Sequence, residues 1–240
     1  MADYSQLNPE LLVATVEKLS VRIGERFPQA GLFRVSQHLC AVATESHKRV
    51  TESARQSLWI RALIGLLLVV LVIGTVMSIS AFRIQPRSEP VTWLELVQAI
   101  ESGINDIVFI GIGVFFLASL ENRIRRRRIL KALHELRSLA HVIDMHQLTK
   151  DPQRAAGVLL TTPSSPSDAL TPEQLLRYLD YCSEMLSLVG KLAASYLQHS
   201  DDEVVLSTVD EIEGLTTGLS RKIWQKLMII HAGLNPQTKP

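Results

Sequence analysis

The sequence has few cysteines, few aromatic residues and almost no net charge. It contains two cysteines, Cys40 and Cys182, in 240 residues. Two thiols cannot form the disulfide framework of a small secreted domain or a zinc site built from cysteines. Aromatic residues make up 5% of the chain and hydrophobic residues 47%, with a net charge of +1. This balance excludes a disordered chain and directs attention to where the aliphatic residues are concentrated.

The sequence also lacks the motifs of common enzyme classes. It has no P-loop, HExxH, GxGxxG or paired-carboxylate pattern. Cys182 lies at helical spacing among apolar residues, where a thiol usually serves packing. We therefore expect a protein that is not an enzyme and that needs no cofactor.

A run of twenty uncharged residues at 62–81 predicts a first membrane span. A helix of this length covers roughly 30 Å, the thickness of the hydrocarbon core. Trp59 and Arg61 precede the run and Arg83 follows it, and these residue types favour the membrane interface. We expect transmembrane helix 1 at 58–83.

A shorter run predicts a second span. The uncharged stretch at 107–120 has fourteen residues and covers about 21 Å as a helix. The span must therefore extend towards the N-terminus, and we place it at 103–121. A re-entrant segment or a core helix is the alternative for a run of this length. A hairpin is favoured because it keeps both flanking basic clusters on one side of the membrane.

Basic residues predict the orientation of this hairpin. They flank both spans on the side of the chain termini, whereas the connection at 84–102 carries only Arg87. By the positive-inside rule both termini are cytoplasmic, and the chain is a multi-pass protein of the inner (plasma) membrane. The densest cluster follows the second span and is expected to contact anionic lipid head groups. Its members are Arg123, Arg125, Arg126, Arg127 and Arg128.

The external connection at 84–102 is predicted to contain a short amphipathic helix. Thr92 and Glu95 have capping-box spacing, and apolar residues recur at helical intervals from Trp93 onward. Such a helix would lie in the outer interface. Gly103 is expected to bend the chain into the second span.

The N-terminal segment 1–57 and the segment 122–152 carry the apolar stripes of helices. Asn8 and Pro9 have the residue types of an N-cap and a first turn. A second stripe in the N-terminal segment has few breakers and is expected to run into the first span as one helix. The segment 122–152 keeps a seven-residue rhythm that includes Gln147.

The C-terminal part predicts a loop followed by a helical hairpin. The segment 153–170 is rich in proline, serine and threonine. Thr171 and Gln174, with a proline between them, predict a helix start with a capping box, and Ser200 is expected to cap the next helix. The segment 171–240 should form the hairpin. The stripe of its first helix contains Leu175, Leu179, Cys182, Leu186, Val189 and Tyr196.

Together these patterns predict an all-α integral membrane protein with a two-helix transmembrane hairpin and a cytoplasmic helical bundle built from the N- and C-terminal parts. Residues 121–150 carry 8 basic and 3 acidic groups, whereas residues 151–240 carry 7 and 11. A basic collar with an acidic distal domain suits an anionic leaflet. It does not suit a nucleic-acid binder, whose soluble domain should be basic.

Glu101, Asn105 and Asp106 are candidate intramembrane polar residues. A charged side chain costs ~2.5–3.5 kcal/mol at the bilayer centre and less near its rim, so such residues usually face a protein interior or a watery path. The alternative is that the span begins here, because a helix N-terminus favours negative charge. In an oligomer a ring of Asp106 side chains would favour cations, whereas the arginines at the other end would oppose them.

Small residues recur on both spans and predict close helix packing. They are Gly74 and Ser78 on the first span, and Gly103, Gly111 and Ala118 on the second. Small faces let helices approach closely in lipid. Two helices have little interior of their own, so we expect packing between subunits of a homo-oligomer as well as within the hairpin.

His134, His141 and Asp144 are candidate metal ligands. The two histidines are seven residues apart on one helix face, and Asp144 follows one turn later. Zinc needs three or four converging ligands, so a second helix or subunit would have to contribute. Histidines on an exposed or inter-helix face, or a protonation-sensitive contact, are the alternatives.

The leading functional hypothesis is a homo-oligomeric membrane protein that presents its cytoplasmic domain as a scaffold, adaptor or sensor. Its partners would be membrane lipids and a cytoplasmic protein, and no nucleic acid. A homo-oligomeric ion channel lined by the second span is the alternative hypothesis. A metal- or pH-responsive regulator is a further one.

Overall fold

The computed structural model describes most of the chain, and the described part is built from helices. The described residues are 7–84, 92–155 and 170–234. No strand occurs in these three ranges, so the prediction of an all-α chain is confirmed for them. Most of the predicted loop at 153–170 lies outside the described residues.

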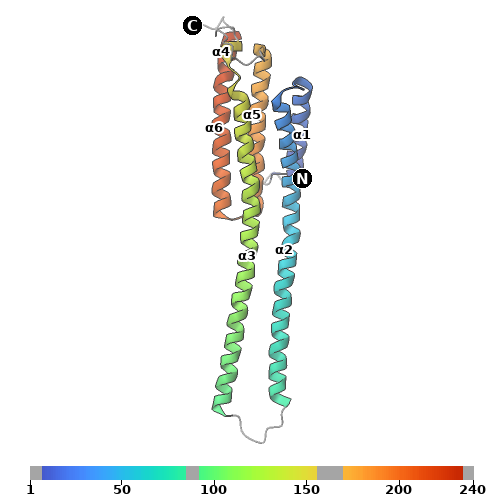
Figure 1. Cartoon of the computed structure of the whole chain (residues 1–240), viewed down its shortest axis with the longest axis vertical. Coiled ribbons are helices and arrows are strands. Elements are labelled where there is room, and N and C mark those ends of the chain that lie inside the picture. The colour runs from blue at the N-terminus through green and yellow to red at the C-terminus, as the bar shows by residue number, and fades with distance from the viewer. Residues whose placement is uncertain (1–6, 85–91, 156–169, 235–240) are drawn as a thin grey trace, which may run out of the picture. The chain divides into compact units, whose positions relative to one another are not determined.

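The helices belong to two compact units (Figure 1). Unit 1 combines residues 1–50 with residues 128–240, and unit 2 contains residues 51–127. Unit 1 therefore joins the N-terminal part of the chain to its C-terminal part. The elements are α1 (Pro9–Arg26), α2 (Gly31–Ile84), α3 (Trp93–Leu148), α4 (Pro152–Ala155), α5 (Pro172–Ser195), the 3-10 helix η1 (Tyr196–His199) and α6 (Glu203–Leu234).

Two helices begin where their capping residues predict. The Asn8 side-chain oxygen accepts the backbone N–H groups of Glu10 at 2.9 Å and Leu11 at 3.2 Å. Thr171 and Gln174 form the expected capping box, in which each side chain accepts the backbone N–H of the other residue. These contacts satisfy N–H groups that the first turn of a helix leaves unpaired.

The predicted bend at Gly103 is wrong. α3 runs without interruption from Trp93 to Leu148, so the short interfacial helix is the first part of a longer one. A glycine inside a helix costs only about 1 kcal/mol relative to alanine. The residues on both sides of Gly103 form helix, and they stabilise α3 by more than this cost.

The predicted cap of α6 is also wrong. The side chain of Asp202, rather than that of Ser200, accepts the N–H groups of Val204 at 3.0 Å and Val205 at 3.3 Å. Aspartate caps as well as serine does, and its charge interacts favourably with the positive end of the helix. Glu203 becomes the first residue of α6 instead of the partner in a capping box.

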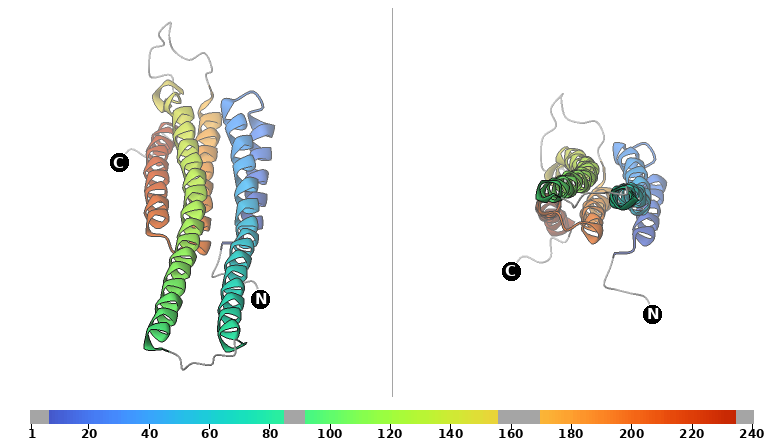
Figure 2. Two further views of the ribbon diagram at one scale, coloured as in Figure 1. Left: turned by 60° about the horizontal axis from the view of Figure 1, so that its bottom comes forward. Right: turned by 90° about the horizontal axis from the view of Figure 1, so that it is seen from below.

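The core of unit 1 is formed by side chains from α1, the start of α2, the end of α3, α5 and α6. Figure 2 shows these helices side by side from two further directions. The predicted stripe of α5 is buried throughout, as is that of α1. The second stripe consists of Leu12, Val16, Leu19 and Ile23 of α1 and of Phe27, which follows it.

α5 is the central helix of unit 1, because thirteen of its 24 residues are buried and it packs against both α1 and α6. Phe27, the residue that follows α1, meets the rings of Tyr178 and Tyr181 edge-on, with centroids 5.5 and 6.3 Å apart. Towards α6, a Cβ on Gly190 would lie 3.2 Å from the hydroxyl oxygen of Thr216. The helix therefore buries a second face that the predicted stripe did not include.

Buried hydroxyl groups pair between helices that are distant in the sequence. The Tyr196 hydroxyl donates to the Ser46 oxygen at 2.8 Å. The Ser20 and Ser36 hydroxyls lie 2.9 Å apart between α1 and α2. A buried polar group without a partner costs about 1–3 kcal/mol, so these pairs favour one register of the helices.

Leu186→Ala is expected to destabilise unit 1 by about 2–5 kcal/mol, because it leaves a cavity at a side chain that is 0% exposed on the central helix. The adjacent Ser187 is exposed and gives a matched control, with a change below about 0.5 kcal/mol expected for Ser187→Ala. Urea denaturation of the detergent-purified chain, followed by helicity, measures both. Equal midpoints for the two variants would contradict a core centred on α5.

Candidate functional site

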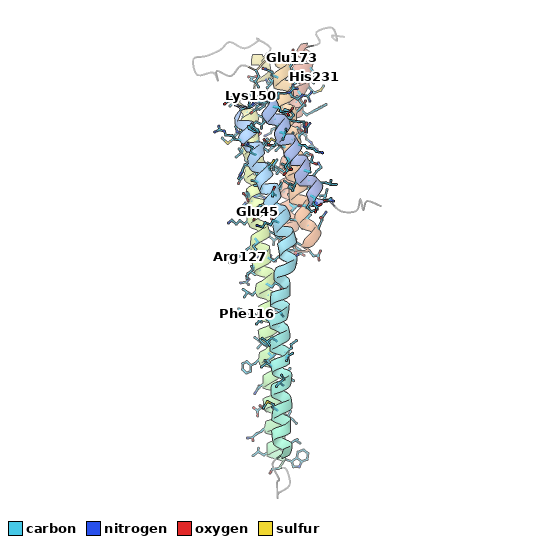
Figure 3. The ribbon with its side chains drawn as sticks, turned by 90° about the vertical axis from the view of Figure 1, so that its right-hand side faces the viewer. Glu45, Phe116, Arg127, Lys150, Glu173 and His231 are labelled. Atoms are coloured by element: carbon cyan, nitrogen blue, oxygen red, sulfur yellow. The ribbon has the colours of Figure 1, made fainter. Side chains whose placement is uncertain are left out.

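Unit 2 has an apolar surface made of large side chains on α2 and α3 that are exposed rather than packed. Phe116, labelled in Figure 3, is 63% exposed. The α2 members are Leu63, Leu66, Leu68, Val69, Val70, Ile73 and Met77. The α3 members are Trp93, Leu94, Leu96, Val97, Ile100, Ile104, Ile107, Val108, Phe109, Ile112, Phe115, Phe116, Leu120 and Ile124.

One helix in the described part of the chain is long and apolar enough to cross a membrane. It spans Leu96–Leu148, and its apolar window is 0% buried. Length and composition are weak evidence by themselves, because the core helix of a soluble protein can share them; such a core helix is mostly buried. The predicted first span at 62–81 includes side chains outside the described ones, so the two-span hairpin stays a prediction.

The predicted lipid-contact arginines are exposed. They are Arg123, Arg125, Arg126, Arg127 and Arg128, which follow the apolar part of α3; Arg127 is labelled in Figure 3. Consecutive residues point in successive directions around a helix. The run therefore forms a cationic girdle rather than one face.

The predicted intramembrane polar residues are described only in part. Glu101 and Asn105 are exposed on α3. The side chain of Asp106 lies outside the described residues, so its role in a pore stays a prediction.

The small residues of the predicted packing face have no close neighbours among the described atoms. A Cβ built on Gly74, Gly103 or Gly111 would meet nothing within 4 Å. Ala118 is exposed, and the side chain of Ser78 lies outside the described residues. Packing of these positions within one chain is therefore not seen, and packing between subunits stays a prediction.

The candidate metal ligands do not converge on one point in the described part of the chain. His134 and His141 are exposed on α3. The Asp144 carboxylate accepts a hydrogen bond from the Gln147 side chain at 2.6 Å. Across the described residues, no group of three or more His, Cys, Asp or Glu side chains is placed to hold a metal ion.

A polar cluster that the sequence did not predict lies at the C-terminal end of α3. The Lys226 ammonium of α6 donates to the backbone carbonyls of Gln147 at 2.7 Å and Lys150 at 3.2 Å. The Lys150 ammonium lies 5.3 Å from the centre of the Tyr178 ring. A cation is favourable near the carbonyl groups at the C-terminal end of a helix. Lys226 therefore links α6 to the end of α3.

Burial controls the protonation of this cluster. It lowers the pKa of Lys226, and the carboxylates of Asp151 and Asp144 partly oppose that change. Burial also raises the pKa of the nearby Cys182 thiol to about 12. Cys182 is therefore protonated at neutral pH and is a packing residue rather than a nucleophile.

His146 is held against the turn between α1 and α2. Its imidazole occupies the space that a Cβ on Gly31 would need. Burial lowers the pKa of His146, and the positive charges of Lys150 and Arg34 add to the effect. The neutral imidazole is therefore the form that the folded bundle favours.

One signal in the sequence pointed to the cluster at the end of α3. Gln147 occupies a core position of the seven-residue rhythm and is 1% exposed, and its side-chain oxygen is the one buried side-chain polar atom without a hydrogen-bond partner among the described residues. A polar residue at such a position requires polar neighbours. The Gln147 side chain donates to Asp144 on the same helix. Lys226, 79 residues away, contacts only the backbone carbonyl of Gln147, so the residue type at position 147 does not identify it.

Comparison of the chain with protein families, with curated proteins and with solved structures finds no match. The functional argument therefore depends on the residues themselves.

Lys226→Met is expected to destabilise unit 1 by about 1–3 kcal/mol, because it keeps the aliphatic stem but removes the donor to two carbonyl groups. Lys222 lies one turn earlier and is exposed, so Lys222→Met should change stability by less than about 0.5 kcal/mol. Urea midpoints of the full chain in detergent measure both. If only the positive charge mattered, Lys226→Met and Lys222→Met would lower the stability equally, and this result would contradict a role for the two hydrogen bonds.

The stability of unit 1 is expected to fall when the pH drops below about 6.5, the ordinary pKa of histidine. The folded-state pKa of His146 is lowered, so the unfolded chain takes up its proton first as the pH falls. This contribution is complete above the unfolded pKa and is lost as the pH falls through the folded one. Comparing urea midpoints at pH 7.5 and pH 5 should give a smaller loss for His146→Gln. An unchanged loss would exclude His146 as its source.

Proposed function

We propose that the chain is a two-span protein of the inner (plasma) membrane that presents unit 1 in the cytoplasm. Unit 1 acts there as a non-catalytic scaffold or adaptor, and the protein works as a homo-oligomer. The observation that carries this proposal is a contrast between the units. Large apolar side chains are buried in the core of unit 1 and exposed along both helices of unit 2.

The size of the apolar surface of unit 2 supports a lipid environment. It comprises seven large side chains on α2 and fourteen on α3. At about 1 kcal/mol for the exposed half of each side chain, contact with water would forfeit roughly 20 kcal/mol. The net stability of a domain is only about 5–15 kcal/mol. A bilayer removes this cost because lipid surrounds a helix on all sides.

The charges support the orientation. The exposed arginines that follow the apolar part of α3 would stay on the cytoplasmic side, where each cation near an anionic leaflet contributes about 1 kcal/mol. Residues 151–240, which include α5 and α6, carry 7 basic and 11 acidic groups. An acidic domain beyond a basic collar is repelled from the anionic leaflet and remains accessible to a protein partner.

The polar groups of unit 1 support docking rather than catalysis. The buried hydroxyls of Tyr196 and Ser46 pair with one another, and Lys226 is engaged by backbone carbonyls. The Cys182 thiol is kept protonated by burial. These groups hold helices together, and the exposed helix faces remain as the surfaces available to a partner.

Cysteine labelling in a Cys40→Ser background tests the topology. Cys182 can remain, because it is 0% exposed. A membrane-impermeant maleimide should label Ser88→Cys in intact cells, because residue 88 lies in the external connection. The matched variant Ser187→Cys, at an exposed site of α5, should be labelled only after permeabilisation. Labelling of Ser187→Cys in intact cells, or a chain that stays in solution without detergent, would refute the proposal.

A further inference from the structure

Three basic side chains come together where the end of α3 meets the beginning of α2. The His146 ring of α3 lies against Gly31, the first residue of α2. Arg34 follows Gly31 by three residues, so it shares the helix face that the ring contacts. The positive charges of Arg34 and Lys150 both lower the pKa of His146, which requires them to lie near the ring. We call Arg34, His146 and Lys150 the Arg34 cluster.

The described part of the chain supplies no balancing negative charge to the Arg34 cluster. Arg34 and Lys150 form no ion pair within that part. The first turn of α2 contains no acidic residue. Every cause of the pKa shift of His146 lowers its pKa, so no carboxylate offsets the two cations at the ring.

The acidic residues of the neighbouring elements are engaged elsewhere. The Asp144 carboxylate accepts a hydrogen bond from the Gln147 side chain at 2.6 Å. Asp151 accepts a backbone N–H at the start of α4 at 2.9 Å. Glu173, labelled in Figure 3, belongs to the first turn of α5, where the positive end of that helix favours a negative charge. The Arg34 cluster therefore lacks the partner that grouped cations normally have.

The position of Arg34 makes this lack unfavourable. Arg34 lies in the first turn of α2, where the aligned peptide dipoles already place partial positive charge and a further cation is repelled. Arg34 is exposed, and His146 and Lys150 are half-buried, so a dissolved ion can reach all three. An anion at this place would remove the repulsion among them.

We propose that the Arg34 cluster binds the phosphate group of a small soluble molecule, either inorganic phosphate or a phosphate monoester. A guanidinium group can donate two parallel N–H groups to phosphate oxygens, and a lysine ammonium adds a point charge. A protonated imidazole donates a further hydrogen bond. The negative charge of the phosphate would raise the pKa of His146, so binding takes up a proton at the ring.

A soluble source of the phosphate is favoured over a lipid head group by position. Arg128, the last arginine of the cationic girdle, and His146 are 18 residues apart on the uninterrupted helix α3, about 27 Å along its axis. If the girdle lies at the lipid head groups, the Arg34 cluster lies beyond their reach. This assignment of the source rests on the proposed function, whereas the binding site itself does not.

Isothermal titration calorimetry of the full-length protein in detergent, with inorganic phosphate at constant ionic strength, tests the site. The unchanged chain should bind one phosphate. Arg34→Gln should weaken binding by about fivefold, the loss of one exposed charge pair, and Arg34 is exposed, so the core is unaffected. Lys222→Gln, at an exposed site of α6, should leave the affinity unchanged. No binding to the unchanged chain, or equal affinities of the two variants, would overturn the proposal.

The pH dependence of sulfate binding tests the role of the ring. Sulfate keeps its charge between about pH 8 and about pH 5.5, so a change in its affinity reports on the protein. Its binding should tighten severalfold as the pH falls, because the anion binds the protonated form of His146 more strongly. His146→Gln keeps a donor but takes up no proton, so its affinity should stay nearly constant. The same tightening in His146→Gln would overturn the role of the ring.

Phosphate titrations in nanodiscs with and without phosphatidate, a lipid whose head group is a phosphate monoester, test the source. Equal affinities are expected, because about 27 Å exceeds the screening length of about 8 Å at physiological ionic strength. Weaker phosphate binding with phosphatidate would show that a lipid occupies the Arg34 cluster and would overturn the soluble source. Binding in detergent does not depend on topology. Its failure therefore leaves the proposed function standing, and a failed cysteine-labelling test leaves the binding site standing.

Discussion

Unit 1 depends on the burial of two faces of α5. Every other long helix of the bundle is apolar along one stripe and needs a partner for it, and α5 provides surfaces for both α1 and α6. Thirteen residues of this helix are buried, and each large side chain among them contributes about 1.5–3 kcal/mol of burial free energy. The polar pairs between helices then select one arrangement of a core that the apolar contacts already hold.

The two units place the same kinds of side chain in opposite settings. Leucine, isoleucine and valine fill the interior of unit 1 and cover the outside of unit 2. A large exposed apolar surface marks a site of contact with lipid or with a protein partner, so this difference distinguishes the two units more clearly than overall composition does. Properties of the whole chain, such as its net charge of +1, do not reveal this difference between the units.

The sequence predicted those features of the fold that depend on contacts between residues close together in the chain. Asn8 and Thr171 were identified as caps because their partners lie within three residues, and the buried stripe of α5 followed from helical periodicity. The second face of α5 was missed because Tyr178 and Tyr181 carry polar groups that do not mark a core position. Ser200 and Asp202 both have the chemistry of a cap, and only the path of the chain distinguishes them.

The remaining features depend on contacts between distant parts of the chain. The hydrogen bond from Lys226 to the end of α3 and the packing of His146 on Gly31 leave no repeated spacing to detect. The candidate ligands His134, His141 and Asp144 show the converse, because a suitable spacing on one helix does not place them around one metal ion. Spacing along one helix indicates which residues share a face but not what faces them.

The aromatic contact between Phe27 and Tyr178 has a consequence for how the protein is made. The two residues are separated by about 150 positions of translation, so α1 leaves the ribosome well before the helix that it packs against. At 5–20 residues per second, Tyr178 is synthesised roughly 8–30 s after Phe27. The contact between α1 and α5 therefore forms only after most of the chain has been synthesised.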